Sequence, residues 1–400
     1  MARARVALGF TNTVDYEAVW DAAALERLMS KHGLVQSDVL PWPRIDTMRQ
    51  LLGTVLWHFS QGSGCGQFVE NGVLFDELLS CLTCKITLGG TAVRAALVLN
   101  RLGIDSVVHL VSTNEPTRRL LPPGVQAVCA AQSDTLYPHL SIQFPEGAQL
   151  HALGKVWTAP RSNRAIFTDD VDNASLPLTA AFFEKAQSCS ALVLSSFDII
   201  QDRALLESRL ADVQRRLAGC LDSWVFYEDA HFSHADFPNL ICERLLPLID
   251  FYSLNEDEFC ARCGRAVCFE DPGDVLRALE ELRAKIPARC LILHTQYWAL
   301  AYGPLAPQAR DALKLACAVA ATRFRLGDDW TLNDLAQTSR QPPYPQGVAM
   351  ADHLTQFCSF PWAVQPGFTV TADVPTTIGL GDSFVGGFTA ALCKNEKKLH

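Results

Sequence analysis

The sequence predicts an α/β protein with a mostly parallel sheet that is covered by helices on both faces. Short apolar runs rich in β-branched residues alternate with segments whose apolar residues recur every three or four positions, a pattern typical of such sheets. The chain has 400 residues, of which 49% are hydrophobic and 19% charged. This length suffices for one large domain, or for a large domain with a smaller one.

Strands and helices are expected to alternate along most of the chain. The strand-like runs cover residues 5–10, 84–88, 105–111, 191–196, 224–227, 250–254, 289–294 and 367–371. The clearest amphipathic helices cover residues 45–59, 91–102, 202–217, 273–285 and 308–324. The alternation is most regular in the second half of the chain, and it indicates a doubly covered parallel sheet there.

Residues 112–177 differ, because prolines divide them into short segments without a strong helical pattern. Glu146-Gly147 lies between two such segments, as a hairpin turn would. We therefore expect a smaller β-rich lid lobe made of residues 13–82 and 112–177. The large nucleotide-binding domain would comprise residues 1–12, 83–111 and 178–400.

Charge and hydropathy limit the partners and the compartment. The net charge is −9 and the isoelectric point is about 5.6, without any run of Lys and Arg, which argues against nucleic acid and anionic membranes as partners. No window of about 18 apolar residues is present, and the N-terminus lacks a signal-peptide pattern. We expect a cytoplasmic protein that binds small molecules; the sequence does not indicate its oligomeric state.

The 14 cysteines are expected to be reduced thiols, because an export signal is lacking. Two groups nevertheless have spacings seen in metal sites: Cys81 with Cys84, and Cys260 with Cys263 and Cys268. A zinc site would require both groups to meet across the fold, so buried thiols and zinc stay as alternatives.

The strongest chemical signal is the turn Gly379-Leu380-Gly381-Asp382 before an apolar, small-residue helix. Two glycines allow a tight turn with exposed N–H groups, and the helix adds its positive end. Such a turn can stabilise a phosphoryl group in flight, while Asp382 accepts the proton of an attacking hydroxyl. The alternative is that Asp382 merely caps the helix.

This turn resembles the ribokinase superfamily of sugar kinases, and further motifs resemble its ADP-dependent glucokinases and phosphofructokinases. Asn255-x-x-Glu258 matches an Asn-x-x-Glu signature, and Phe226-Tyr227-Glu228 stands where that family has His-x-Glu. Other matching segments, in the order of the family, are residues 9–15, Gly89-Gly90, residues 159–166 and His294-Thr295. The resemblance implies a ribokinase-like α/β domain, a β-rich lid, and ADP as the phosphoryl donor.

The matching positions carry expected roles. Glu228 and Glu258 follow neighbouring strands and would hold Mg²⁺, largely through water, although Asn255 and Glu258 also fit a helix-capping box. The remaining assignments are sugar binding by Asn12, Asp15, Gly89 and Gly90, and nucleotide binding by Arg161, Arg164, Thr377 and Asn255. Lys155 is a further cation that could meet a phosphate, and His294 is expected to be a core histidine without a chemical role.

Three departures from the family pattern stand out: one concerns the positioning of the metal, and two concern the acceptor side. Phe226 replaces a histidine, Gly66 aligns with a sugar-binding glutamate, and Thr91 stands where Asn or Gln is usual. The acceptor is therefore left open between glucose and fructose 6-phosphate. Two other functions stay open: an ATP-dependent ribokinase-like kinase of sugars or nucleosides, and a regulator that binds sugar or nucleotide without catalysis.

Overall fold

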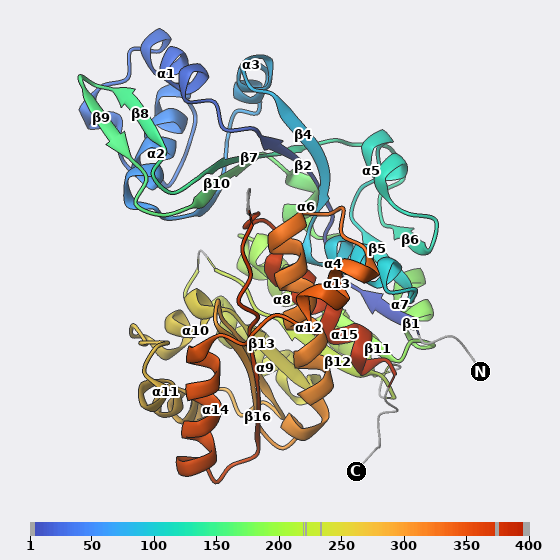
Figure 1. Ribbon diagram of the computed structural model, residues 1–400. Coiled ribbons are helices and arrows are strands. Elements are labelled where there is room, and N and C mark those ends of the chain that lie inside the picture. The colour runs from blue at the N-terminus through green and yellow to red at the C-terminus, as the bar shows by residue number, and fades with distance from the viewer. Residues whose placement is uncertain (1–4, 219, 221, 233, 373–375, 395–400) are drawn as a thin grey trace.

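The computed structural model describes residues 5–218, 220, 222–232, 234–372 and 376–394. They form two separate sheets and a two-stranded hairpin, with helices packed on both sheets (Figure 1). The nine-stranded sheet is called the large sheet here, and the five-stranded sheet the small sheet.

The large sheet has the order β16-β15-β14-β13-β12-β11-β1-β5-β6. Its strands are β1 (Arg5–Leu8), β5 (Asp105–Leu110), β6 (Val125–Cys129), β11 (Ala191–Leu194), β12 (Trp224–Glu228), β13 (Phe251–Leu254), β14 (Leu291–His294), β15 (Trp298–Tyr302) and β16 (Trp362–Pro366). All neighbours pair in parallel except β14 with β15 and β15 with β16. Strand β1 lies where the chain order reverses, which is where open α/β sheets bind ligands.

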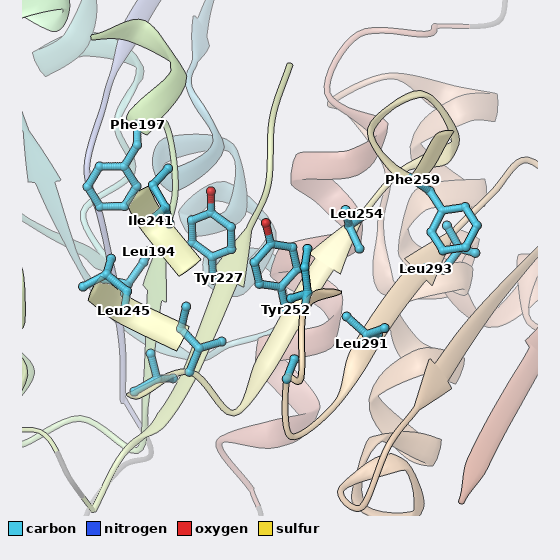
Figure 2. Packing of buried hydrophobic residues seen from close by; sticks show 14 of the residues in the cluster. Leu194, Phe197, Tyr227, Ile241, Leu245, Tyr252, Leu254, Phe259, Leu291 and Leu293 are labelled. Atoms are coloured by element: carbon cyan, nitrogen blue, oxygen red, sulfur yellow. The ribbon is translucent and has the colours of Figure 1, made fainter. Parts of the chain in front are cut away.

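Helices cover both faces of the large sheet, as the sequence predicts. One face packs against α7 (Ala180–Ala186), α8 (Arg203–Leu217), α9 (Phe237–Leu245), α10 (Glu256–Cys263), α11 (Pro272–Lys285) and α14 (Pro345–Phe357). The other packs against α4 (Thr91–Arg101), α12 (Ala306–Leu326), α13 (Leu332–Thr338) and α15 (Leu380–Leu392). Figure 2 shows the first core, in which side chains from neighbouring strands such as Leu254 and Leu293 lie beside Phe259 of α10.

Close packing places the last helix, α15, at the centre of the second face. A Cβ atom on Gly387 would lie 2.8 Å from Cα of Ala316 on α12, and one on Gly386 would lie 2.7 Å from Cβ of Val98 on α4. Both glycines therefore allow helix backbones to approach. Phe388 contacts Phe226 of β12, with ring centroids 5.1 Å apart, so the helix that follows the glycine-rich turn is firmly fixed on the sheet.

The small sheet has the order β3-β10-β7-β2-β4 and its own apolar core. Its strands are β2 (Thr13–Ala18), β3 (Cys65–Phe68), β4 (Cys84–Gly89), β7 (Pro138–Phe144) and β10 (Asn163–Thr168). One face packs against α1 (Ala22–Lys31), α2 (Met48–Gln61) and α3 (Val73–Cys81), and the hairpin of β8 (Gln149–Ala152) and β9 (Lys155–Thr158) joins them. The hairpin turn expected at Glu146-Gly147 instead precedes β8, and β8 and β9 turn at Leu153-Gly154.

Three expected boundaries are corrected. Strand β4 pairs with β2, so residues 84–89 belong to the small sheet rather than to the predicted 83–111 part of the large domain. Strand β6 pairs with β5, and with α5 (Glu115–Leu120) it belongs beside the large sheet, not within a 112–177 lobe. The last strand is β16, not residues 367–371. In each case the sheet to which a segment belongs depends on pairing with a strand that is distant in sequence. The local sequence does not contain this information.

The remaining elements are α6 (Val171–Ser175) and three short 3₁₀ turns at Gln36–Asp38, Phe197–Ile199 and Leu246–Leu248. Among the described helices, none is long and apolar enough to cross a lipid bilayer. The 14 cysteines are free thiols, and burial raises the pKa of Cys65 to about 12. Within the described part of the chain, no three Cys, His, Asp or Glu side chains converge as metal ligands, so the two cysteine groups do not form a zinc site.

Candidate active site

A cavity of about 340 Å³ opens at the carboxyl ends of the large-sheet strands. A polar residue at the end of β12 and of β14, and polar residues just after the ends of β1, β11 and β13, line it. The small sheet contributes a further wall through Thr13 and Arg164. The residues lining the cavity at these strand ends are Thr11, Ser195, Ser196, Glu228, Asn255 and His294. The parallel topology therefore brings together groups that are far apart in sequence.

The glycine-rich turn lines the same cavity, next to the ends of β12 and β14. Gly379 adopts a left-handed conformation, with φ of 68°, and α15 begins at the next residue. No side chain caps this helix start, so the first N–H groups of the helix have no partner within it and face the cavity wall formed by Thr377 and residues 379–382. The turn thus has the geometry expected of an anion hole.

Asp382 is held at the start of α15 by two groups from α4. The Thr91 hydroxyl donates to Oδ1 of Asp382 at 2.8 Å, and Nε of Arg94 lies 3.7 Å from Oδ2. The Asp382 side chain is 24% exposed and lines the cavity. Part of the Asp382 carboxylate therefore remains accessible to a ligand in the cavity. Thr91, a departure from the family pattern, supports the predicted base.

Glu228 lies beside the anion hole. A Cβ atom on Gly381 would be 3.8 Å from Oε1 of Glu228 and 3.6 Å from Cε1 of His294. His294 lies 3.1 Å from the same Oε1 through Nε2, and its ring stacks on Phe384. The other oxygen, Oε2 of Glu228, is buried and has no hydrogen-bond partner among the described residues.

Glu258 lines the same cavity as Glu228 and also caps α10. Asn255 and Glu258 form the capping box: the Asn255 N–H donates to Glu258 Oε2 at 2.8 Å, and the Glu258 N–H donates to Asn255 Oδ1 at 2.9 Å. Burial, together with the negative charge of Glu228, raises the pKa of Glu258 well above its ordinary value. The helix cap predicted from the sequence is therefore present, and the same side chain lines the cavity.

Two aspartates that the sequence analysis missed extend this acidic wall. Asp198 follows β11, and burial with a smaller effect of the Asp229 charge raises its pKa to about 6. Asp229 is paired with Arg262 at 2.7 Å and accepts hydrogen bonds from Tyr227 and Tyr252, whose hydroxyls point to the same end of the sheet in Figure 2. Asp229 is therefore neutralised, whereas no cation among the described residues forms an ion pair with Asp198.

The predicted sugar-binding residues divide into two groups. Gly90 lines the cavity with φ of 84°, and a Cβ there would lie 2.8 Å from the Thr11 carbonyl oxygen. Asn12 is buried away from the cavity: its Nδ2 donates to the Ser112 carbonyl at 3.0 Å, and its Oδ1 accepts from the Val111 N–H at 2.7 Å. Its amide therefore fixes the loop after β1 rather than meeting a ligand.

Asp15 and Gly89 lie just behind the cavity wall. Oδ1 of Asp15 accepts from the Thr13 hydroxyl at 2.6 Å, and Oδ2 accepts from Nη2 of Arg94 at 2.8 Å. A Cβ atom on Gly89 would be 2.2 Å from the Asp15 carboxylate, so glycine is required for this contact. Asp15 is thus part of an ion-pair network rather than a free acceptor for sugar hydroxyls.

The predicted phosphate-binding cations also separate. Arg164 on β10 lines the cavity, and burial, reinforced by the charge of Arg94, lowers its pKa. Arg161 donates from Nε to the Gly62 carbonyl at 2.7 Å, and its charge acts on Glu256 at the start of α10. Lys155 lies on β9 with its ammonium 3.7 Å from the Trp157 ring centroid, away from the cavity.

The family departures have structural explanations. Phe226 is fully buried against Phe388, while His294 from β14 supplies an imidazole beside Glu228. The sequence analysis expected His294 to be a core histidine. Its position at the carboxyl end of a parallel strand is the signal that identifies it as a residue of the site. Gly66 on β3 faces open space, with no atom within 4 Å of a Cβ built there.

A parallel sheet whose strand ends carry acids, next to a glycine-rich helix start with a carboxylate, is the arrangement expected of a phosphotransferase site of the α/β kinase class. The glycine-rich turn could hold an anion, and the carboxylate could accept a proton. The chain belongs to the family of ADP-specific phosphofructokinases and glucokinases, since the model of the family's conserved region matches residues 4–387. It is accordingly an ADP-dependent sugar kinase, and the predicted family and reaction class are confirmed.

The curated relatives and solved structures agree with this membership. The ADP-dependent glucose/glucosamine kinase of Pyrococcus furiosus is 23% identical over 446 residues, which cover 97% of this chain and 95% of that protein. A phosphofructokinase from Pyrococcus horikoshii, solved with AMP, matches with a TM-score of 0.78 at 14% identity over 98% of each chain. An ADP-dependent kinase in complex with fructose 6-phosphate and ADPβS also gives 0.78, at 13% identity over 99% and 95% of the two chains. These likenesses confirm the predicted ribokinase-like α/β fold.

Proposed function

We propose that this chain transfers the terminal phosphoryl group of ADP in line to a hydroxyl of a hexose or hexose phosphate in the cytoplasm, with Asp382 as the base. The observation that carries the proposal is the placement of Asp382 beside the Gly379–Gly381 turn on one wall of the cavity. A reacting phosphoryl group in this cavity can meet the helix N–H groups and the base together.

Asp382 is suited to accept the proton of the sugar hydroxyl. Thr91 donates to one of its oxygens and Arg94 lies beside the other, so the carboxylate has a fixed orientation. The N–H groups at the start of α15 would stabilise the charge on the transferring oxygens. Phosphoryl transfer needs positioning and electrostatic stabilisation above all, and this arrangement provides both.

The acidic wall fits a divalent cation. Glu228 has a buried oxygen without a partner among the described residues, and the pKa of Glu258 is raised by burial and by the charge of Glu228. Both observations indicate excess negative charge that a cation would relieve. Glu228 and Glu258 would hold Mg²⁺ largely through water, which suits an ion that retains its hydration shell. When bound, Mg²⁺ supplies positive charge that neutralises phosphate oxygens.

The nucleotide and the sugar would occupy different sides of the cavity. Asn255, Thr377 and Arg161 mark the nucleotide side, near the start of α10, where Arg161 acts on Glu256. Gly90 and Arg164 mark the sugar side, near Asp382. The relatives named above act on glucose, glucosamine or fructose 6-phosphate, and we propose that the acceptor here belongs to the same class of hexoses and hexose phosphates.

A coupled phosphorylation assay tests this function. Purified protein with Mg²⁺ is given ADP or ATP in turn, each with glucose, glucosamine or fructose 6-phosphate, with adenylate kinase inhibited and the ADP free of ATP. We expect turnover with ADP and the formation of AMP. Turnover with ATP alone would assign the donor differently, and binding of nucleotide without turnover of any sugar would indicate a regulator.

A further inference from the structure

Arg94 is the most deeply buried cation near the catalytic turn. It lies on α4, one turn after Gly90, and its side chain is 2% exposed. Placing a guanidinium in such a position is costly unless other groups compensate its charge. The surrounding contacts identify these groups, and they come from one strand of the small sheet and from the helix α15.

The guanidinium joins strand β2 of the small sheet to the start of α15. Nη2 donates to Asp15 at 2.8 Å and to Glu17 at 3.2 Å, and Nε lies 3.7 Å from Asp382. Thr87 of β4 also donates to Glu17, at 2.7 Å, which fixes the second carboxylate. One cation therefore contacts the candidate base and two carboxylates of the small sheet.

The same side chain supports the anion hole from behind. A Cβ atom on Gly379 would lie 2.7 Å from Cδ and 3.0 Å from Nη1 of Arg94, so the turn rests directly on the arginine. Nη1 is buried and has no hydrogen-bond partner among the described residues. This unpaired donor places positive charge beneath the turn where a phosphoryl group would acquire negative charge.

The charge on Arg94 is maintained by its partners. Burial alone would disfavour the charged form, but the carboxylates of Asp15, Asp382 and Glu17 outweigh burial and raise the pKa of Arg94 above its ordinary value. Arg94 is therefore a cation in this position.

We propose that Arg94 is a positioning residue for phosphoryl transfer: its fork orients Asp382 against the Gly379 turn and ties both to Asp15 and Glu17 of the small sheet. The inference rests on the proposed function. Asp15, expected from the sequence to bind sugar, then acts through Arg94. The planar fork matters because a lysine ammonium is a single point that cannot serve Asp382 and the β2 carboxylates with the same geometry.

The test compares Arg94→Lys and Arg94→Ala with the wild type. Steady-state kinetics give kcat and KM for ADP and sugar, and calorimetric titration with ADP gives the number of competent sites. We expect Arg94→Lys to lower kcat per site by about 100-fold, since small misplacements of reacting groups have effects of that size. KM for ADP should change less than about threefold, because Arg94 does not line the nucleotide side. Added guanidinium ion should restore part of the kcat of Arg94→Ala.

Arg101 provides the matched control. It lies two turns further along α4 and donates to the Trp330 carbonyl at 2.6 Å, far from the cavity. Arg101→Lys and Arg101→Ala should keep kcat per site and show no response to guanidinium. If Arg94→Ala does not fold, the kcat per site of Arg94→Lys is sufficient to test the inference.

An Arg94→Lys protein with wild-type kcat per site, or a loss explained entirely by fewer competent sites, would overturn the inference. If the wild type is active and Arg94→Lys behaves in either of these two ways, only this inference is overturned and the proposed function stands. A wild type without any kinase activity would overturn the proposed function and this inference with it.

Discussion

The large sheet and the small sheet place polar groups near the cavity in two different ways. In the large sheet, each of several parallel strands ends in one polar residue, as β12 does in Glu228 and β14 in His294. In the small sheet, polar residues alternate along single strands, as Asp15 and Glu17 do on β2. The first arrangement follows from topology, because parallel strands end at a common edge.

The second arrangement depends on partners. Asp15 and Glu17 lie on one face of β2, where like charges two residues apart destabilise each other unless a cation lies between them. Arg94 is that cation, and it comes from a helix of the other core. Polar residues at strand ends can thus be identified as a site from the local sequence. The role of the charged residues on β2 can be identified only when the contact with Arg94 is known.

The largest expected effect lies on the large-sheet side of the comparison. Asp382→Asn should lower kcat by about 10³-fold or more while leaving ADP affinity near the wild-type value, since a positioned base contributes about 10²- to 10⁴-fold. Steady-state kinetics and ADP titration measure both quantities. Thr331→Ala, at the start of α13, controls for the loss of an ordinary helix cap. An Asn variant with wild-type kcat would remove Asp382 from the mechanism.

The next effect concerns the end of β12. Glu228→Gln should lower kcat by about 10- to 100-fold and raise the Mg²⁺ concentration for half-maximal rate, because it removes a charge from the proposed cation site. Asp257→Asn, an exposed neighbour of Glu258 on α10, is the matched control. Titration of the rate with Mg²⁺ distinguishes the two variants. An unchanged Mg²⁺ requirement in Glu228→Gln would contradict the metal assignment.

A smaller effect is expected on the small-sheet side. Arg164→Ala removes the cation of β10 that lines the cavity, and we expect kcat/KM to fall by about tenfold, mainly through a higher KM. Arg44→Ala removes a cation of the same part of the chain whose side chain is 68% exposed, and it should leave the kinetics unchanged. Equal kinetics in the two variants would show that Arg164 does not contact either substrate.

The smallest effect is a pH dependence of stability. The pKa of Asp198 is raised from 3.8 to about 6 by burial and by Asp229, so its neutral form favours folding at low pH, and this contribution is lost as pH rises through 6. Asp198→Asn should therefore stabilise the metal-free protein at pH 8 by about 1 kcal/mol more than at pH 4.

Thermal or urea unfolding in EDTA at the two pH values measures this difference. Asp311→Asn on α12 gives the effect of removing an exposed carboxylate. A stability gain for Asp198→Asn that is the same at pH 4 and pH 8 would contradict the assignment.

Much of the large sheet could be predicted from the sequence, because its buried strands are short apolar runs and its helices are amphipathic. The glycine-rich turn and Asp382 were found from residue type and order alone. The capping box of Asn255 and Glu258 was also predicted, and it exists in the structure. In these cases the local conformation depends on neighbouring residues in the chain, so the local sequence is informative.

The failures share a physical cause. Asn12 is the right residue type after the right strand, yet its amide bonds to the loop at Val111 and Ser112, about 100 residues away. Arg94 looked like an ordinary helix residue, and its role appears only when β2 and α15 are packed around it. The assignment of β4 and β6 to sheets likewise depends on pairing that no local pattern encodes.

The position of β1 inside the large sheet, between β11 and β5, has a consequence for biosynthesis. Its partner β11 is synthesised about 180 residues later, as the Thr11 to Ser196 contact across 185 positions also shows. At roughly 5–20 residues per second, this delay amounts to about 10–40 s. During that interval the first strand of the nascent chain exposes an unpaired edge, and such edges attract aggregation or chaperones. Synonymous codons that slow translation between β1 and β11 would lengthen the exposure without altering the native protein.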